Sequence, residues 1–208
     1  MSSTPRLVLG TNNPHKRSEL AEMLAGSIPG GGIEVATLAD FANAIEVEET
    51  GTTFAENSRL KAVEQAKHLG EWVLADDSGI AIDALKGRPG VDSAHFAGPQ
   101  RDNDANNQLV LDELAGVPRQ RRGAKYVCHV VLADPAGEVQ AEAVGTCRGE
   151  IATELRGSGG FGYDPLFIVR EYHRTFGELG PAVKQTLSHR SRALRTILPD
   201  LVRLLAPR

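Results

Sequence analysis

The stretch Leu74-Ala75-Asp76-Asp77-Ser78-Gly79 places two adjacent carboxylates directly after a short apolar run, residues 72–75. That run predicts a buried strand that ends at the carboxylates and delivers them to the edge of a sheet, where open α/β sheets bind ligands. Neighbouring residues of a strand point to opposite faces, so one carboxylate can face a given ligand while the other braces the turn. We predict that Asp77 carries the chemistry. The alternative is a solvated turn, which Asp, Ser and Gly also favour.

The composition is that of an ordinary globular chain, because 41% of its 208 residues are hydrophobic. A chain of this length can bury a core, and we expect a single domain over residues 1–208. Its apolar segments are far shorter than the ~20 residues that cross a bilayer, and no charged and then apolar leader begins it. We therefore expect a cytoplasmic protein without a membrane partner. Cys128 and Cys147 have no CxxC spacing, which favours buried reduced thiols over a zinc site or a disulfide.

The charge balance argues against a nucleic-acid partner. A formal net charge of -4 gives no general attraction to a polyanion. The basic cluster of Arg119, Arg121, Arg122 and Lys125 is short and lacks interleaved aromatic residues, so it predicts a solvated loop. An anionic ligand would have to be held by local groups.

The N-terminal segment predicts a strand, a polar loop and the start of a helix. Residues 6–10 are apolar apart from Arg6, and the loop 11–16 reads Thr-Asn-Asn-Pro-His-Lys. Free backbone N–H groups and the helix dipole at such a junction suit an anion, and Thr11, Asn13 and Lys16 would add polar contacts. We predict a phosphate cradle, although the Walker A and GxGxxG patterns are absent. The alternative is an asparagine-rich turn that caps the helix.

The other patterns give the expected order of elements. They are a helix that stops at Gly26, a glycine-rich turn over 27–32, a strand over 33–38, a helix over 53–70 that begins with a Thr53–Glu56 capping box, a strand over 79–85, a turn over 86–90, a helix over 102–114, a hairpin of strands 125–133 and 138–147, a short apolar run over 166–169, and a last amphipathic helix that ends near Leu205. Because the hairpin is antiparallel, the fold class should be α/β with a mixed sheet.

An acidic stretch, residues 46–49, precedes the second helix. Such acids can simply interact with the helix dipole. They can also form half of a metal site, since Mg²⁺ takes one or two carboxylates together with phosphate oxygens of a substrate. Glu49 and Asp77 would supply that pair.

Two later segments carry further candidates. Residues 157–165 contain four glycines around Phe161 and Tyr163, so backbone could approach a ligand closely and an aromatic ring could face a base. The alternative is a glycine-rich surface loop. Near the start of the last helix, which Ser188 would cap, stand Lys184, His189 and Arg190. Cations are disfavoured at a helix start unless an anion or an acceptor is near, which favours a ligand role.

Five motifs occur in this order along the chain: Thr-Asn-Asn-Pro-His-Lys (11–16), Glu-Glu-Thr-Gly-Thr-Thr-Phe-Ala-Glu-Asn (48–57), Ala-Asp-Asp-Ser-Gly (75–79), Gly-Gly-Phe-Gly-Tyr-Asp-Pro (159–165) and Lys-x-x-x-Ser-His-Arg (184–190). Together they closely resemble the inosine/xanthosine triphosphate pyrophosphatase family, over nearly the whole chain. The resemblance implies an elongated mixed β-sheet with flanking helices, in two lobes around a central nucleotide-binding cleft, and a homodimer. It also implies Mg²⁺-dependent hydrolysis of ITP, dITP and XTP to the monophosphate and pyrophosphate.

The resemblance also assigns roles to residues. It implies a phosphate-binding loop over Thr11, Asn12, Asn13, Pro14, His15 and Lys16, with Lys16 on the triphosphate. Glu49 would bind the metal, and Asp77 would be the metal-linked general base, followed by the substrate contact Ser78. The nucleoside would meet Phe161, Gly162, Tyr163 and Asp164, and the base would be read by Lys184, His189 and Arg190.

Side chains such as His189 and Arg190 would donate hydrogen bonds to the 6-oxo group of a purine. They would reject a 6-amino group, because unpaired buried donors cost several kcal/mol. Two alternatives stay open. The chain could bind nucleotides without turnover, which the intact Glu49 and Asp77 pair argues against. It could also be a Maf-like pyrophosphatase that acts on other modified nucleotides, and loss of purine discrimination in variants at 189 and 190 would separate these readings.

Overall fold

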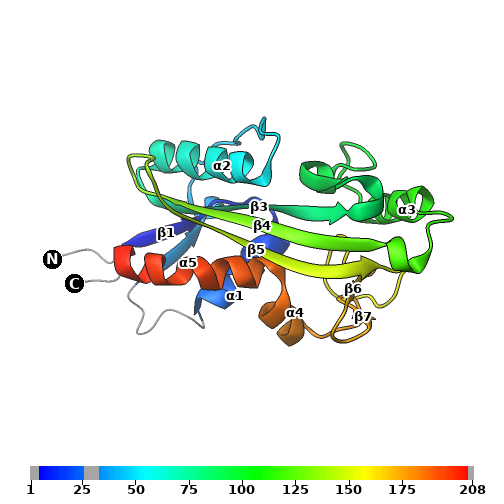
Figure 1. Ribbon diagram of the computed structural model, residues 1–208. Coiled ribbons are helices and arrows are strands. Elements are labelled where there is room, and N and C mark those ends of the chain that lie inside the picture. The colour runs from blue at the N-terminus through cyan, green and yellow to red at the C-terminus, as the bar shows by residue number, and fades with distance from the viewer. Residues whose placement is uncertain (1–4, 26–32, 206–208) are drawn as a thin grey trace. The chain divides into compact units, whose positions relative to one another are not determined.

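The computed structural model describes residues 5–25 and 33–205 and has a mixed α/β fold (Figure 1). Its strands are β1 (Arg6–Leu9), β2 (Glu34–Thr37), β3 (Trp72–Ile82), β4 (Gly123–Ala133), β5 (Val139–Ile151), β6 (Phe167–Val169) and β7 (Arg174–Thr175). Its α-helices are α1 (Pro14–Ala25), α2 (Phe54–Leu69), α3 (Asn103–Glu113), α4 (Pro181–Leu187) and α5 (His189–Leu205). The predicted helix stop at Gly26 and the turn over 27–32 lie outside the described residues.

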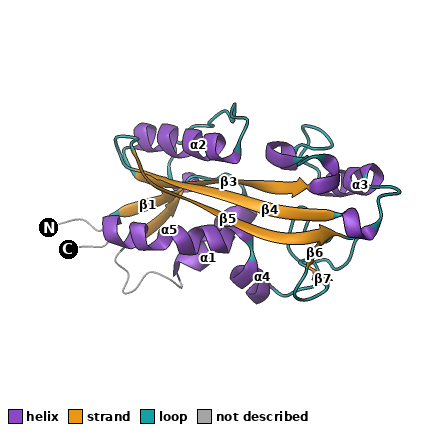
Figure 2. Cartoon of the chain, in the orientation of Figure 1, coloured by secondary structure: helices purple, strands orange, loops and turns teal. Residues whose placement is uncertain are grey.

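The strands form one sheet in the order β2-β1-β3-β4-β5-β6-β7. Figure 2 shows the long strands β3, β4 and β5 of this sheet. β1 is parallel to β2 and β3, whereas β6 is antiparallel to β5 and β7. The hairpin turn at Asp134–Gly137 is closed by a bond from the Gly137 N–H to the Asp134 carbonyl, 2.7 Å, and Gly137 has a φ of 79°. The predicted mixed sheet and hairpin are therefore confirmed.

Strand β3 differs from the prediction. It runs without a break from Trp72 to Ile82, so Asp76 and Asp77 stand inside a strand that lies between β1 and β4. The predicted strand end and sheet edge at these carboxylates are wrong, and the separate strand expected over 79–85 is the second part of β3 followed by a short 3₁₀ helix at Asp83–Leu85. Gly79 makes no turn: a Cβ there would lie 2.2 Å from the Ser93 Oγ, so glycine is needed for close packing.

The described residues fall into two compact units. Unit 1 comprises Met1–Asp77, Cys128–Gly145 and Arg190–Arg208, and unit 2 comprises Ser78–Val127 and Thr146–His189. The single domain expected for residues 1–208 stays a prediction, as do the elongated shape and the central cleft.

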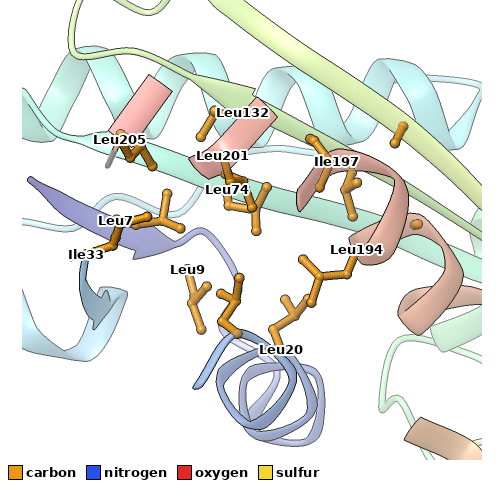
Figure 3. Close-up of a cluster of buried hydrophobic side chains, with 14 of the residues drawn as sticks. Leu7, Leu9, Leu20, Ile33, Leu74, Leu132, Leu194, Ile197, Leu201 and Leu205 are labelled. Atoms are coloured by element: carbon orange, nitrogen blue, oxygen red, sulfur yellow. The ribbon is translucent and has the colours of Figure 1, made fainter. Parts of the chain in front are cut away.

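Unit 1 buries both faces of its strands. On one face, alternate residues of β1, β3 and β4 pack with α1 and α5, and Figure 3 shows Leu9, Leu20 and Leu194 directed into this cluster. On the other face of these strands, the intervening residues, such as Val8 and Val73, pack against Ala62 and Ala66 of α2. Successive residues of a strand point to opposite faces. Asp76 therefore lies on the same face as Leu74, toward α1 and α5, and Asp77 lies on the same face as Val73, toward α2.

Unit 2 has an aromatic core around Tyr126, Phe167 and Phe176. The prediction of a solvated basic loop is wrong for one member of the cluster, because Arg122 is buried and its guanidinium donates to the carbonyls of Leu114, Val117 and Ala152. A buried guanidinium has five N–H donors, and these carbonyls accept from three of them.

Both cysteines are buried and unoxidised, as predicted. Among residues 5–25 and 33–205, none of the helices combines the length and the apolar character that a membrane span requires.

Candidate active site

The junction between β1 and α1 is built by local hydrogen bonds. The Asn13 Oδ1 accepts from the backbone N–H groups of His15 (3.0 Å) and Lys16 (3.2 Å), and the Thr11 hydroxyl accepts from the Asn13 N–H at 3.2 Å. Asn13 therefore caps α1, which confirms the capping alternative for that residue. Asn12, Asn13, Pro14 and His15 are exposed and Thr11 is buried. The phosphate-binding role of residues 11–16 stays a prediction.

Asp76 is the fully buried anion of unit 1. Its Oδ2 lies 3.3 Å from the Lys16 Nζ and 3.4 Å from the Arg190 Nε, and Arg190 also pairs with Glu19. Burial alone would raise the pKa of Asp76, but the charges of Lys16 and Arg190 outweigh burial and hold that pKa well below its usual range. Asp76 is thus ionised throughout the neutral range and serves as the counter-ion of two cations.

Asp77, on the opposite face of β3, shares a lysine with Glu49. The Lys61 Nζ lies 3.1 Å from the Asp77 Oδ1 and 2.8 Å from the Glu49 Oε2. Burial is the largest influence on the pKa of Asp77 and raises it, although the ammonium of Lys61 opposes this rise. Burial would also raise the pKa of Glu49, but Lys61 outweighs it and the pKa of Glu49 is lowered. The two predicted metal-binding carboxylates are therefore brought together on one ammonium group.

Asn57 links Asp77 to the loop that carries Glu49. The Asn57 Oδ1 accepts from the backbone N–H of Gly51 at 2.7 Å, which leaves its Nδ2 to donate to the Asp77 Oδ2 at 3.4 Å. A Cβ at Gly51 would lie 2.6 Å from this Oδ1, so only glycine allows the contact. The position of the loop and the position of the carboxylate thus depend on one amide group.

The start of α2 positions Asn57 and Lys61, the two side chains that contact Asp77. The predicted capping box is confirmed, because the Thr53 hydroxyl accepts from the Glu56 N–H at 3.2 Å and the Glu56 carboxylate accepts from the Thr53 N–H at 3.1 Å. Fixing this first turn directs Asn57 and Lys61, one turn apart, toward β3. The sequence analysis missed both residues. Their spacing of four beside the buried Ala62 and Ala66 is the signal that could have found them.

The chemistry of this cluster suits a hard cation. Glu49 and Asp77 offer carboxylate oxygens, the ligands that Mg²⁺ prefers. Both carboxylates already contact one cation, the ammonium group of Lys61. Within the described ranges no group of three or more His, Cys, Asp or Glu side chains is arranged to hold a metal ion. A metal held by this pair would therefore need further oxygen ligands from water or from a substrate phosphate.

Unit 2 contains the predicted nucleoside loop, and Asp164 organises it. The Asp164 Oδ2 accepts from the backbone N–H of Phe161 at 2.8 Å and from the Lys184 Nζ at 2.5 Å, and Oδ1 accepts from the Tyr126 hydroxyl at 3.4 Å. The ammonium of Lys184 also lies 4.2 Å from the centre of the Phe161 ring. Two of the predicted contacts, Phe161 and Lys184, are therefore set by the same carboxylate.

The two residues between Phe161 and Asp164 are also fixed. The Asn107 Nδ2 donates to the Gly162 carbonyl at 3.0 Å, and the Tyr163 hydroxyl donates to the Ser93 carbonyl at 2.7 Å. Burial raises the pKa of Tyr163, so its hydroxyl keeps the proton that it donates. Residues 161–164 thus form a braced loop, whereas residues 157–160 of the same segment are exposed, as the alternative of a glycine-rich surface loop expects.

The remaining candidates divide between the units. His189 is buried in unit 2 with its ring stacked on Tyr126, and Ser78, half-buried, directly follows Asp77 on β3. Arg190 is buried in unit 1 with Asp76 and Glu19. The structure thus groups Lys184 and His189 within one unit and places Arg190 in the other, although the sequence predicted all three as readers of the base. Ser188, the predicted cap, directly precedes α5 with extended backbone.

Comparison with known proteins gives a consistent family. The family model described as Ham1 family matches residues 7–200. The chain is 56% identical over 198 residues to a dITP/XTP pyrophosphatase of Rhodopirellula baltica, covering 95% of this chain and 93% of that protein. It is 48% identical over 199 residues to a dITP/XTP pyrophosphatase of Desulforamulus reducens, covering 96% of each. Among solved structures, a HAM1 protein from Coxiella burnetii matches with a TM-score of 0.86 and 37% identity over 96% of this chain and 99% of that one.

Proposed function

This chain belongs to the Ham1 family, and we propose that it hydrolyses ITP, dITP and XTP to the nucleoside monophosphate and pyrophosphate. The relatives named dITP/XTP pyrophosphatase support this substrate class. The observation that carries the proposal is the cluster in which Lys61 holds both Asp77 and Glu49. Hydrolysis of a phosphoric anhydride needs a base for water and positive charge for the phosphate oxygens, and this cluster offers both.

Asp77 acts as the general base in this proposal. Burial raises the pKa of Asp77 and the ammonium of Lys61 opposes this rise, and a raised pKa makes a carboxylate a stronger proton acceptor. It would orient a water molecule for attack on the α-phosphorus and take up the proton of that water. Asp76, one residue earlier, is held by Lys16 and Arg190 and does not compete for this role.

Lys16 and Lys61 provide the positive charge. Their side chains are 15% and 13% exposed, respectively, and already lie against carboxylates of β3. Phosphate oxygens that gain charge during the reaction would be stabilised by these ammonium groups. The braced start of α1 fixes the backbone from which Lys16 extends.

We propose Mg²⁺ as the cofactor, with Glu49 and Asp77 as its protein ligands. Bound there, the ion would neutralise charge on the phosphate oxygens and on the leaving pyrophosphate. The support is the oxygen donor set and the cation that the pair already shares. Removal of Mg²⁺ with EDTA should abolish turnover, and restored activity on adding Mg²⁺ would separate a metal requirement from unfolding.

The purine base is read, in this proposal, by the braced loop and its neighbours in unit 2. Lys184 and His189 would donate to the 6-oxo group, and the Phe161 ring would offer a flat face. A 6-amino group would meet donors with donors, which disfavours ATP. For Arg190 the same role requires its guanidinium to serve the substrate as well as Asp76 and Glu19.

A homodimer and a cytoplasmic location are further proposals, and the family resemblance supports the first. Sedimentation equilibrium of the purified chain tests the dimer, for which we expect twice the mass of 22.3 kDa.

The function is tested by incubating the purified protein with Mg²⁺ and ITP, XTP, GTP, ATP, dUTP or dTTP, with pyrophosphate and orthophosphate detected separately. We expect pyrophosphate from ITP and XTP and little product from ATP or GTP. Orthophosphate in place of pyrophosphate would contradict the bond proposed, and preference for a pyrimidine would contradict the base.

A further inference from the structure

We propose that Tyr126 is a positioning residue for base recognition, because it fixes the imidazole ring of His189 and supports Asp164. This inference rests on the proposed function of the loop in unit 2. Tyr126 is part of no sequence motif: it lies on β4, outside the five segments that resemble the family.

The contact between Tyr126 and His189 is a parallel stack. The ring centroids lie 4.6 Å apart and the ring planes differ by 9°. Both residues are buried, with exposed fractions of 7% for Tyr126 and 5% for His189. A parallel neighbour at this distance blocks rotation of the imidazole about its χ2 bond, since the turning ring would collide with the tyrosine face.

Tyr126 is itself held in place. Its ring packs against Phe167 with centroids 4.6 Å apart, whereas the ring of Phe176 lies farther off, with centroids 6.4 Å apart. Such an aromatic pair stabilises the ring beyond the apolar area that it buries. The ring that stacks on His189 is therefore part of the aromatic core of unit 2.

The hydroxyl of Tyr126 reaches a second predicted base contact. It donates to the Asp164 Oδ1 at 3.4 Å, and Asp164 in turn accepts from Lys184 and from the Phe161 N–H. The usual O–H···O distance is about 2.7–2.8 Å, so this bond is weak. The ring should accordingly contribute more to positioning than the hydroxyl.

The orientation of His189 matters because hydrogen bonds lose strength steeply as they bend. An imidazole free to turn would donate to a 6-oxo group for only part of the time. Loss of the Tyr126 ring should thus weaken ITP binding and purine discrimination more than the rate of the chemical step, whereas a merely structural defect would lower activity on every nucleotide alike.

The test compares Tyr126→Leu, Tyr126→Phe and the matched control Phe176→Leu, which removes a ring of the same core that stacks on Phe167 instead of His189. For Tyr126→Leu we expect KM for ITP to rise about tenfold and the ratio of kcat/KM for ITP over ATP to fall about tenfold. Tyr126→Phe should stay within about threefold of the wild type on both measures, and Phe176→Leu should keep the ratio. A Tyr126→Leu ratio equal to that of the wild type, or an equal fall in Phe176→Leu, overturns the proposal.

A second measurement is independent of activity. The ring protons of His189, assigned with the variant His189→Gln, should show an upfield ring-current shift in proton–carbon NMR spectra. That shift should vanish in Tyr126→Leu and persist in Tyr126→Phe and Phe176→Leu; its persistence in Tyr126→Leu would overturn the stack as the positioning contact. If the wild type shows the shift but does not prefer ITP to ATP, the proposed function fails while the positioning of His189 by Tyr126 stands.

Discussion

The two units hold their buried carboxylates in different ways. In unit 1, Asp76 and Asp77 are surrounded by ammonium and guanidinium groups from distant parts of the chain, namely Lys16, Lys61 and Arg190. In unit 2, Asp164 is held by a backbone N–H, a hydroxyl and one lysine. Charge contacts tolerate movement but respond strongly to a new ion, whereas several directed hydrogen bonds fix a shape. The first arrangement suits phosphate chemistry, and the second suits recognition of a base.

The largest effect should come from Asp77→Asn. The variant keeps the size of the side chain but removes the base and a metal ligand, so we expect turnover of ITP to fall at least about a hundredfold with little change in KM. Steady-state kinetics with ITP measure this. Near-normal turnover would show that the charge of Asp77 contributes to the structure of unit 1 and not to catalysis. Asp83→Asn, a change in unit 2 at the end of β3, is the matched control and should behave as the wild type.

Asp76→Asn should mainly change stability, because it leaves the guanidinium of Arg190 without its buried anion. We expect a loss of about 2 kcal/mol at pH 7. The pKa of Asp76 is lowered by folding, so its contribution is present above the unfolded pKa of about 3.9 and is lost as the pH falls. Urea unfolding at pH 7 and pH 3 should therefore show a smaller difference between variant and wild type at pH 3. An equal difference at both values would mean that ionised Asp76 does not stabilise the fold.

Lys184→Met tests whether the hydrogen-bonded carboxylate site of unit 2 acts in substrate binding. It removes the charge beside Asp164 and Phe161 but keeps the aliphatic stem, so we expect KM for ITP to rise about tenfold while kcat changes less than threefold. The exposed Lys86, in the same unit, provides the control variant Lys86→Met. A fall in kcat without a rise in KM would show that this lysine serves the chemistry and not the base.

The smallest effect should come from Asn57→Ala, which cuts the link between the Gly51 N–H and Asp77. We expect kcat/KM for ITP to fall about fivefold, since Lys61 still holds both carboxylates. Gly51→Ala should act in the same direction, because its Cβ would displace the Asn57 Oδ1. Ser58→Ala, at the next buried position of α2, contacts His129 and should change kcat/KM less than twofold.

The sequence predicted the elements whose local signals agree with their packing. The capping box at Thr53, the hairpin turn at Asp134–Gly137 and the apolar face of α5 are such cases. It failed at Asp76-Asp77-Ser78-Gly79, where residue types that favour turns are kept in a strand. The ion pairs of the two carboxylates and the close packing of Gly79 on Ser93 stabilise that strand, and both depend on residues distant in the chain.

Buried polar residues explain the other failures. The buried side of α2 carries Asn57, Ser58 and Gln65, and that of α3 carries Asn106 and Asn107, so apolar residues alone do not mark the whole buried side of either helix. The prediction that Arg122 is solvated fails because its carbonyl partners lie at the end of α3 and beyond β5. The placement of Arg190 beside Asp76 joins residues 114 positions apart, and no local pattern contains that information.

Hydrolysis of ITP in water labelled with oxygen-18 tests the central claim most directly. If water activated by Asp77 attacks the α-phosphorus, mass spectrometry should find one labelled oxygen in the inosine monophosphate and none in the pyrophosphate. Label in pyrophosphate, or in orthophosphate released beside inosine diphosphate, would place the attack at another phosphorus and contradict the proposed reaction.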